Sequence, residues 1–343
     1  HALMEQSSEA LAVVNIETRE IVEVNRQYTE LFGYSLPEDS PLYVSKVIVE
    51  PEHTTDNRYT KMLKDQRLLP METITFRHKN GTKVLTERGG TVVTLDGRDY
   101  LLASMRDMTE ERRREAEVAQ DVELAKWVQL ELLPDLPVSP HFTLRSLYFP
   151  SHGISGDSYQ VEWKSEGNIL RGFLLDVSGH GVSTALQSAS VSVLLREAVT
   201  ANTSLQEQVQ QVNIQASKYF VEGSYAALLA FELDFSRREL RYVGAGITRF
   251  YHNGRDILTP GMLVGLLESA QYTTGVLPVE TGDCLHFLTD GFTDVLAQPE
   301  HAGFWSPDGK DFATDVASLE RLAEGRGLRD DASGICLVIN AFS

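Results

Sequence analysis

Short apolar runs that alternate with polar positions dominate the first hundred residues, the pattern of strands with one buried face. Asn-Gly at residues 80–81 and Asp-Gly at residues 96–97 favour tight turns between such runs. Two stretches, 28–34 and 57–66, have a helical pattern. Three hairpins are therefore predicted, joining 11–15 with 21–24, 72–76 with 84–86, and 91–95 with 100–103. Together these elements predict a small α+β domain over residues 1–107.

A polar stretch without glycine or proline follows, from about Thr109 to Leu133, and its Glu, Arg, Ala and Gln content favours one continuous helix. Pro134 comes next and ends the helical pattern. We therefore predict a helical linker within residues 108–137. Two interpretations remain open, a solvated connecting helix or the seam of a helical dimer. The seam would consist of residues spaced by 4, 3, 4 and 3 positions: Val118, Val122, Ala125, Gln129 and Leu132.

From residue 138 onward, strand-like and helical segments alternate. A run over 183–199 is predicted to be a long helix. The predicted strands lie at 169–175, 226–233, 239–243, 284–288 and 334–339. Because 284–288 and 334–339 are apolar almost throughout, we expect these two strands to be covered on both faces. Residues 138–343 are therefore expected to form a second α+β domain.

Composition limits the classes of function. The chain has 343 residues, 42% of them hydrophobic, which suits two globular domains. Its 31 Lys and Arg against 49 Asp and Glu give a net charge of −18, so neither nucleic acid nor anionic membrane is expected as a partner. Cys284 and Cys336 are too few for a disulfide framework or a Cys-based zinc site, and we expect buried free thiols. No membrane span or signal peptide is recognisable, so a cytoplasmic protein is expected.

Acidic residues lie at the ends of several predicted strands. Asp157 comes just before one strand, Asp176 and Asp290 each follow one, and Asp330 and Asp331 precede the last. Each could be a simple turn or cap residue. If the strands are neighbours, however, the carboxylates converge and require a cation. Hard oxygen ligands select Mg²⁺ or Mn²⁺ over zinc, and a pair of such ions can activate a water and neutralise a phosphoryl group.

The order of four motifs resembles the SpoIIE-type phosphatases, the bacterial branch of the PPM (type 2C-like) metal-dependent Ser/Thr phosphatases. The motifs are Gly-Asp-Ser-Tyr at 156–159, Asp-Val-Ser-Gly-His-Gly at 176–181, Thr-Asp-Gly-Phe-Thr-Asp at 289–294 and Asp-Asp-Ala-Ser at 330–333. The likeness begins near Lys126 and covers the chain to its C-terminus. It implies an αββα sandwich with two Mn²⁺ or Mg²⁺ ions at one end.

The resemblance also implies a role for each acidic residue. Asp176 would bridge both ions, and the Val177 carbonyl would help to hold one of them. Asp157 would support this cluster, directly or through a metal-bound water. Asp290 and Asp330 would hold the other ion. Asp157, Asp176 and Asp290 are the predicted catalytic residues.

One ligand is left open by the resemblance, because Asp331 could take the place of Asp330. The implied reaction is attack of a metal-activated water on phosphoserine or phosphothreonine, without a covalent phosphoenzyme. The implied substrate is a STAS-type anti-sigma-factor antagonist, as in partner-switching pathways.

Two positions depart from the family pattern. Gln160 replaces an acidic residue, and Ile247 replaces the usual histidine. The four principal metal carboxylates are retained, so an enzyme is expected. The alternative is a non-catalytic pseudophosphatase that binds a phosphorylated partner; phosphodiesterase or nucleotide chemistry is a weaker third possibility.

The first domain resembles a PAS sensor domain through its segments 21–25, 31–35, 76–81 and 106–110. It has no cysteine, which rules out a flavin-thiol photosensor. His53 is either an exposed loop residue or a haem ligand, and the PAS ligand is otherwise unknown. The resemblance suggests that the PAS state is transmitted through the linker helix to the segment near Asp290. PAS pairing and the helical seam predict a parallel homodimer.

Overall fold

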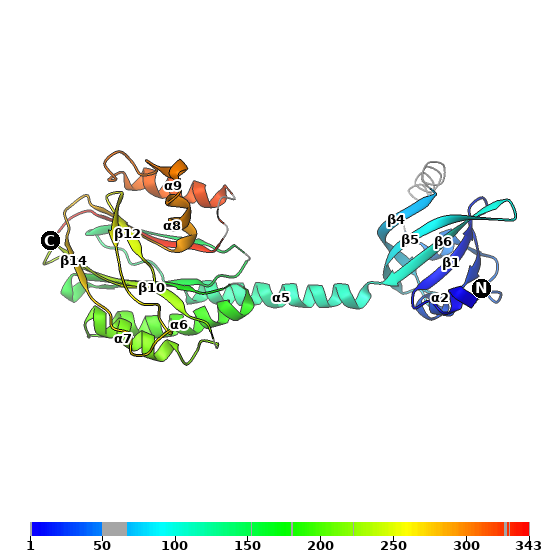
Figure 1. Cartoon of the computed structure of the whole chain (residues 1–343), viewed down its shortest axis with the longest axis horizontal. Coiled ribbons are helices and arrows are strands. Elements are labelled where there is room, and N and C mark those ends of the chain that lie inside the picture. Colours follow the sequence, from blue (N-terminus) through cyan, green and yellow to red (C-terminus); the bar gives the residue numbers. More distant parts are fainter. Residues whose placement is uncertain are drawn as a thin grey trace. The chain divides into compact units, whose positions relative to one another are not determined.

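The computed structural model describes residues 2–49, 67–151, 153–179, 181–221, 223–325, 328 and 330–342. His53, His180 and the predicted helix over 57–66 lie outside these residues. The chain divides into two compact units, residues 1–119 and 120–343 (Figure 1). Within the described ranges, no helix combines the length and the apolar character that crossing a membrane requires.

The first unit is an antiparallel sheet in the order β3-β2-β1-β6-β5-β4, with short helices packed against it. The Asn25 side chain begins α2 by accepting a hydrogen bond from the Tyr28 N–H, and Gly33, at φ +76°, ends it. Phe32 contacts Phe76 at 4.9 Å between ring centroids and closes the core. The elements are α1 (Ala2–Glu5), β1 (Ala10–Asn15), β2 (Glu20–Val24), α2 (Arg26–Phe32), β3 (Leu42–Tyr43), α3 (Val44–Val47), β4 (Leu68–Arg77), β5 (Lys83–Leu95) and β6 (Arg98–Asp107).

The three predicted hairpins are present, but two strands that were predicted as separate form one continuous strand. The runs 84–86 and 91–95 both belong to β5, which pairs with β4 on one side and with β6 on the other. Gly89 and Gly90 interrupt the apolar pattern, which is why two separate strands were predicted. Gly90 is required, because a Cβ there would lie 2.6 Å from the Leu102 carbonyl oxygen. Backbone pairing therefore carries the strand through its glycines.

The predicted linker helix is present as α5 (Thr109–Leu132). The predicted seam along it is wrong at its C-terminal end. Val118 is 62% exposed, as a seam residue would be, but Gln129 is only 8% exposed and is buried in the second unit. The large apolar side chains that stay exposed on this helix are Val118, Leu124, Trp127, Val128 and Leu130.

The second unit contains two five-stranded sheets, ordered β14-β11-β10-β9-β8 and β13-β12-β15-β16-β7. Helices α6 and α7 cover the outer face of the first sheet, and α8 and α9 cover the second (Figure 1). This αββα sandwich confirms the fold expected from the family resemblance. The strands are β7 (Phe142–Phe149), β8 (Asp157–Lys164), β9 (Ile169–Val177), β10 (Ala226–Asp234), β11 (Glu239–Ala245), β12 (Arg249–His252), β13 (Arg255–Leu258), β14 (Gly275–Pro278), β15 (Cys284–Leu288) and β16 (Ala332–Ile339). The helices are α6 (Val182–Thr200), α7 (Leu205–Ala216), α8 (Asp290–Leu296) and α9 (Phe312–Glu324), with short 3₁₀ turns at Ser165–Gly167 and Pro299–His301.

Aromatic stacking joins the two sheets of the second unit. Phe231 of β10 stacks on Phe287 of β15 with 4.1 Å between ring centroids. Gly172 leaves room for this contact, because a Cβ there would lie 2.4 Å from the Phe231 ring. The predicted buried free thiols, Cys284 and Cys336, are present on β15 and β16.

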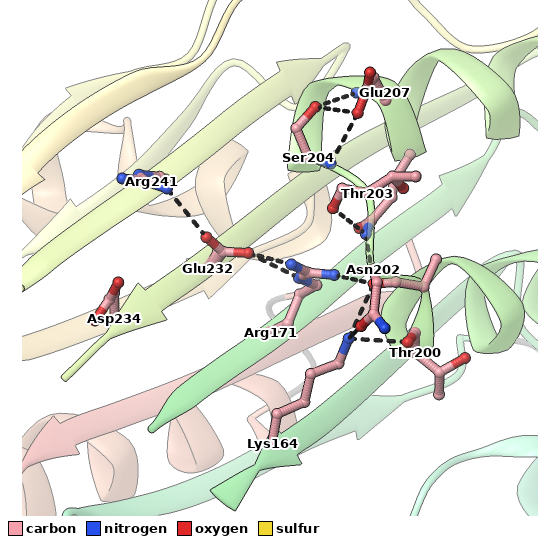
Figure 2. Close-up of polar contacts among 12 residues, drawn as sticks. Lys164, Arg171, Thr200, Asn202, Thr203, Ser204, Glu207, Glu232, Asp234 and Arg241 are labelled. Carbon is pink, nitrogen blue, oxygen red and sulfur yellow. Dashed lines mark hydrogen bonds and ion pairs between the residues drawn. The ribbon is translucent and has the colours of Figure 1, made fainter. Parts of the chain in front are cut away.

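A row of charged side chains crosses β9, β10 and β11, where Arg171, Glu232 and Arg241 lie opposite one another (Figure 2). Arg171 Nε donates to Glu232 at 3.0 Å, and Arg241 Nη1 lies 3.5 Å from the other Glu232 oxygen. Arg171 also donates to the Ala201 carbonyl at 2.7 Å, and Lys164 donates to the same carbonyl at 2.9 Å. These charged side chains therefore attach the turn after α6 to the sheet through hydrogen bonds.

Candidate active site

Strand pairing places two of the predicted metal ligands opposite each other. Asp157 is the first residue of β8, and its pairing partner on β9 is Asp176. Strand β9 extends through Val177, so Asp176 lies inside the strand instead of after it, as its position in the sequence had suggested. The charge of Asp176 raises the pKa of Asp157, as expected for carboxyl groups on paired residues.

The second sheet completes the row of carboxylates. Thr289, which directly follows β15, donates its hydroxyl to Asp157 Oδ2 at 2.9 Å. The next residue, Asp290, opens α8, and its charge raises the pKa of Asp176, which places the two carboxyl groups near each other. Asp157, Asp176 and Asp290 therefore form a row that joins the ends of the two sheets.

Two glycines allow the backbone to approach closely at this row. A Cβ on Gly156 would lie 2.8 Å from the carbonyl oxygen of Val177, the predicted backbone ligand. A Cβ on Gly291 would lie 2.1 Å from the carbonyl oxygen of Asp331. The Gly-Asp and Asp-Gly pairs in the sequence thus reflect close packing around the carboxylates.

Asp330 and Asp331 have different environments. The Asp331 carboxylate accepts hydrogen bonds from the Ser151 N–H at 2.7 Å, the Ser151 hydroxyl at 2.8 Å and the Gly156 N–H at 2.8 Å. Asp330 is exposed, and one of its oxygens accepts a hydrogen bond from the Asp331 N–H at 2.8 Å. Asp331 therefore serves to anchor the segment before β8, and Asp330 has the freer carboxylate.

Burial and mutual repulsion raise the pKa values of the three carboxyl groups in the row. Burial, and then the neighbouring charge of Asp176, raise the pKa of Asp157 well above its usual value. Burial and the charges of Asp290 and Asp330 raise the pKa of Asp176 to about 7. Burial and the charges of Asp330 and Asp294 also raise the pKa of Asp290. Without a counter-charge, the row therefore resists full ionisation.

The donor set suits a divalent cation with a preference for oxygen ligands. Asp157 is 2% exposed, and its Oδ1 has no hydrogen-bond donor among the described residues. An unsatisfied buried carboxylate oxygen beside two further carboxylates is stabilised by Mg²⁺ or Mn²⁺. Within the described part of the chain, no three His, Cys, Asp or Glu side chains surround a single point closely enough to hold an ion. The carboxylates thus form an open row.

The two residues that depart from the family pattern are buried and have other partners. Gln160 is 2% exposed, and its amide donates to the Leu132 carbonyl at the C-terminal end of α5 at 3.1 Å. Ile247 packs in the apolar core between the two sheets. Both side chains therefore have structural contacts in this protein.

Sequence reasoning missed three residues that support the row. Thr289 and Ser151 hold Asp157 and Asp331, respectively, and Gln129 holds Ser155, which directly precedes the Gly-Asp pair. Thr289 directly precedes Asp290 in the Thr-Asp-Gly-Phe-Thr-Asp motif, and this position could have indicated a role beside the carboxylates. Gln129 had been assigned to the helical seam because its spacing fitted that pattern.

Comparisons with known proteins agree with both units. The family described as "Stage II sporulation protein E (SpoIIE)" matches residues 167–337, and "PAS fold" matches residues 1–108. "Phosphoserine phosphatase RsbP" of Bacillus subtilis (strain 168) is 26% identical over 191 residues, which cover 52% of this chain and 46% of RsbP. The chain thus spans less than half the length of this curated relative.

A solved structure shares the fold of the second unit. The SiaA-PP2C domain of Pseudomonas aeruginosa has a TM-score of 0.53 at 21% identity, and the match covers 66% of this chain and 99% of that domain. At this identity the likeness concerns the fold.

Proposed function

Because residues 1–108 form a PAS domain and the second unit belongs to the SpoIIE family of PPM-type phosphatases, we propose that this chain is a PAS-regulated, metal-dependent phosphoserine/phosphothreonine protein phosphatase. The observation that carries the proposal is the row of Asp157, Asp176 and Asp290, in which Asp157 is buried, Asp176 is half-buried and Asp290 is exposed. Its raised pKa values and the unsatisfied Asp157 oxygen call for cations where the two sheets end.

In this proposal, Asp157, Asp176, the Val177 carbonyl, Asp290 and Asp330 hold two Mn²⁺ or Mg²⁺ ions. Bound ions of this kind activate a water and neutralise charge on a transferring phosphoryl group. The reaction is hydrolysis: the water oxygen bonds to phosphorus, the bond from phosphorus to the serine or threonine oxygen breaks, and that oxygen leaves with a proton. The chain's part is to keep the carboxylates close together, with Asp157 buried and with Asp290 and Asp330 open to solvent.

The proposed substrate is a phosphorylated STAS-type anti-sigma-factor antagonist. Support comes from RsbP, a phosphoserine phosphatase by name, and from the SpoIIE family match. The test measures phosphate release from p-nitrophenyl phosphate and from a phosphorylated STAS protein, with Mn²⁺ or with EDTA. We expect Mn²⁺-dependent release from both. If the wild type releases no more phosphate from the STAS protein than Asp176→Ala does, with the PAS signal supplied, the proposal fails.

The alternative, a pseudophosphatase, rested on Gln160 and Ile247. Gln160 donates to the Leu132 carbonyl and Ile247 packs in the core between the sheets, while the carboxylates of Asp157, Asp176, Asp290 and Asp330 are retained. In the same assay a pseudophosphatase would bind the phosphorylated STAS protein without turnover. Comparison with a cyclic nucleotide as substrate separates phosphodiesterase chemistry from phosphomonoester hydrolysis.

For regulation, we propose that α5 passes the PAS state to the carboxylate row through Gln129. The Gln129 amide donates to the Ser155 carbonyl at 2.7 Å and to the Ala185 carbonyl on α6 at 3.3 Å. Its oxygen accepts the Ser155 N–H at 3.0 Å. Ser155 precedes Asp157 by two residues, so a shift of α5 would move the start of β8. The exposed apolar side chains of α5 also support a homodimer through this helix.

Gln129→Ala is expected to weaken this link. The substitution leaves the buried Ser155 N–H and carbonyl without their partner, which should lower the free energy of unfolding by roughly 1–3 kcal/mol. Metal-dependent phosphate release should fall as well, because the strand that carries Asp157 loses its support. Thermal unfolding and the phosphatase assay measure the two effects. Gln120→Ala, on an exposed position of the same helix, is the matched control, and equal behaviour of the two variants would contradict the link.

The contrast between Asp330 and Asp331 leads to opposite expectations. Asp331→Ala removes the acceptor of three hydrogen bonds and should destabilise the metal-free protein by roughly 2–4 kcal/mol. Asp330→Ala should leave that stability unchanged or raise it, since it relieves repulsion, but should weaken Mn²⁺ binding by roughly 10-fold or more. Thermal unfolding in EDTA and calorimetric Mn²⁺ titration measure both. The assignment is overturned if Asp330→Ala is the destabilised variant or if only Asp331→Ala loses Mn²⁺.

A further inference from the structure

A cleft of about 770 Å³ opens beside the proposed ligands Asp290 and Asp330. Helix α8, the turn Pro299–His301 and the last turn of α9 form its walls. Its lining is mainly polar and carries both signs of charge. Besides Asp290 and Asp330, the lining includes Asp294, Glu300, His301 and Arg321.

The balance of charge in this cleft is unfavourable for a phosphate monoester unless a cationic side chain contributes. Bound divalent ions would offset Asp290 and Asp330, but Asp294 and Glu300 would still repel a phosphate dianion. Among the described lining residues, the side chains that can carry positive charge are His301 and Arg321. His301 Nε2 lies 3.7 Å from Glu300, so that histidine already has an acidic neighbour.

Arg321 differs because its guanidinium is held by a neutral partner. Its Nη2 donates to the Ser318 hydroxyl, one turn earlier on α9, at 2.9 Å. Among the residues that the structure describes, no carboxylate forms an ion pair with Arg321. Arg321 lines the cleft, and its remaining N–H donors have no acidic competitor on the described surface.

Helix α9 is a firm support for this side chain. Leu319 is fully buried, and Asp315 is buried and accepts hydrogen bonds from the Ser306 N–H and hydroxyl at 2.7 and 3.1 Å. Asp311 caps the start of the helix by accepting the Thr314 N–H. A binding group on such an anchored helix needs little reordering when a ligand arrives.

We propose that Arg321, which lines the same cleft as Asp290 and Asp330, binds the phosphoryl group of the substrate. This inference rests on the proposed phosphatase function. A guanidinium keeps its charge at all working pH values, and its fork of donors matches two phosphate oxygens. Since inorganic phosphate offers the same oxygens, the same side chain binds the product.

The test compares Arg321→Ala, Arg321→Lys and the control Arg255→Ala, an exposed arginine on β13 of the same unit. For Arg321→Ala we expect kcat/KM to fall by roughly 10- to 100-fold on both p-nitrophenyl phosphate and the phosphorylated STAS protein. The inhibition constant for inorganic phosphate should rise by a similar factor. Arg321→Lys should recover part of the loss, because it restores the charge without the fork.

A second readout does not depend on turnover. Inorganic phosphate should raise the unfolding temperature of the Mn²⁺-loaded wild type and of Arg255→Ala, but not that of Arg321→Ala. Mn²⁺ binding measured by calorimetry should be the same in all variants.

The outcomes separate this inference from the function itself. If Arg321→Ala loses activity on the protein substrate alone, or keeps the wild-type phosphate inhibition, Arg321 does not bind the phosphoryl group, although the phosphatase function stands. If the wild type releases no phosphate from either substrate, the proposed function fails, and the phosphate-dependent unfolding temperature still decides whether Arg321 binds phosphate.

Discussion

Asp176→Asn is expected to abolish Mn²⁺-dependent phosphate release and, in the same protein, to stabilise the metal-free state at neutral pH. The activity should fall by roughly 1000-fold or more, because the central carboxylate of the row would no longer be available to hold the proposed ions. The gain in stability has a separate cause. Asp176 lies among Asp157, Asp290 and Asp330, and a neutral amide removes that repulsion.

The sign of the pH dependence follows from the raised pKa of Asp176. Its pKa in the folded protein is about 7, against an ordinary value of 3.8, so the folded state favours the protonated carboxyl. Its contribution to stability is complete below about pH 4 and is lost as the pH rises through 7. Asp176→Asn should therefore match the wild type near pH 4. At pH 7.5 in EDTA it should be more stable by up to about 4 kcal/mol.

Thermal unfolding across this pH range, with EDTA or with Mn²⁺, measures these effects. Mn²⁺ should raise the unfolding temperature of the wild type and have much less effect on Asp176→Asn. Asp121→Asn, at an exposed position on α5, is the control for loss of one carboxylate. A variant that is less stable than the wild type at pH 7.5 without metal would contradict the repulsive row.

Glu232→Ala is expected to destabilise the second unit by roughly 3–5 kcal/mol. Glu232 is 6% exposed and lies between Arg171 and Arg241, so its removal leaves the buried Arg171 guanidinium without its carboxylate. Removing one partner of a buried ion pair costs more than the pair contributes, because the remaining charge is poorly solvated. Arg171 would still bind the Ala201 carbonyl, and the turn after α6 would then depend on that contact and on Lys164 (Figure 2).

Two comparisons make this expectation specific. Asp256→Ala breaks the more exposed Arg249–Asp256 pair and should cost less than about 1 kcal/mol. The double variant Arg171→Met with Glu232→Leu removes both charges and should be more stable than Glu232→Ala. Chemical denaturation of the full chain provides the three values. If Glu232→Ala and Asp256→Ala lower the free energy of unfolding by the same amount, burial does not make the Glu232 ion pairs more important for stability.

Local chemistry in the sequence was sufficient for most elements of the fold. Asn80-Gly81 and Asp96-Gly97 mark real hairpin turns, and the apolar runs at 284–288 and 334–339 are real buried strands. These features depend on residues that are neighbours in the sequence, and their preferences for turns or strands can be recognised without the tertiary structure. The two runs within β5 were separated wrongly, because backbone pairing continues through glycines that interrupt the side-chain pattern.

By itself, the sequence predicted a PAS-like unit, a connecting helix and a SpoIIE-like unit with acidic residues at its strand ends. Only the tertiary structure decided how those residues are used. It assigned Asp331 to hydrogen bonds with Ser151 and Gly156, and it placed Gln129 against Ser155. The physical reason is distance along the chain: Gly156 and Asp331 are 175 residues apart, and their contact exists only once the two sheets have packed together.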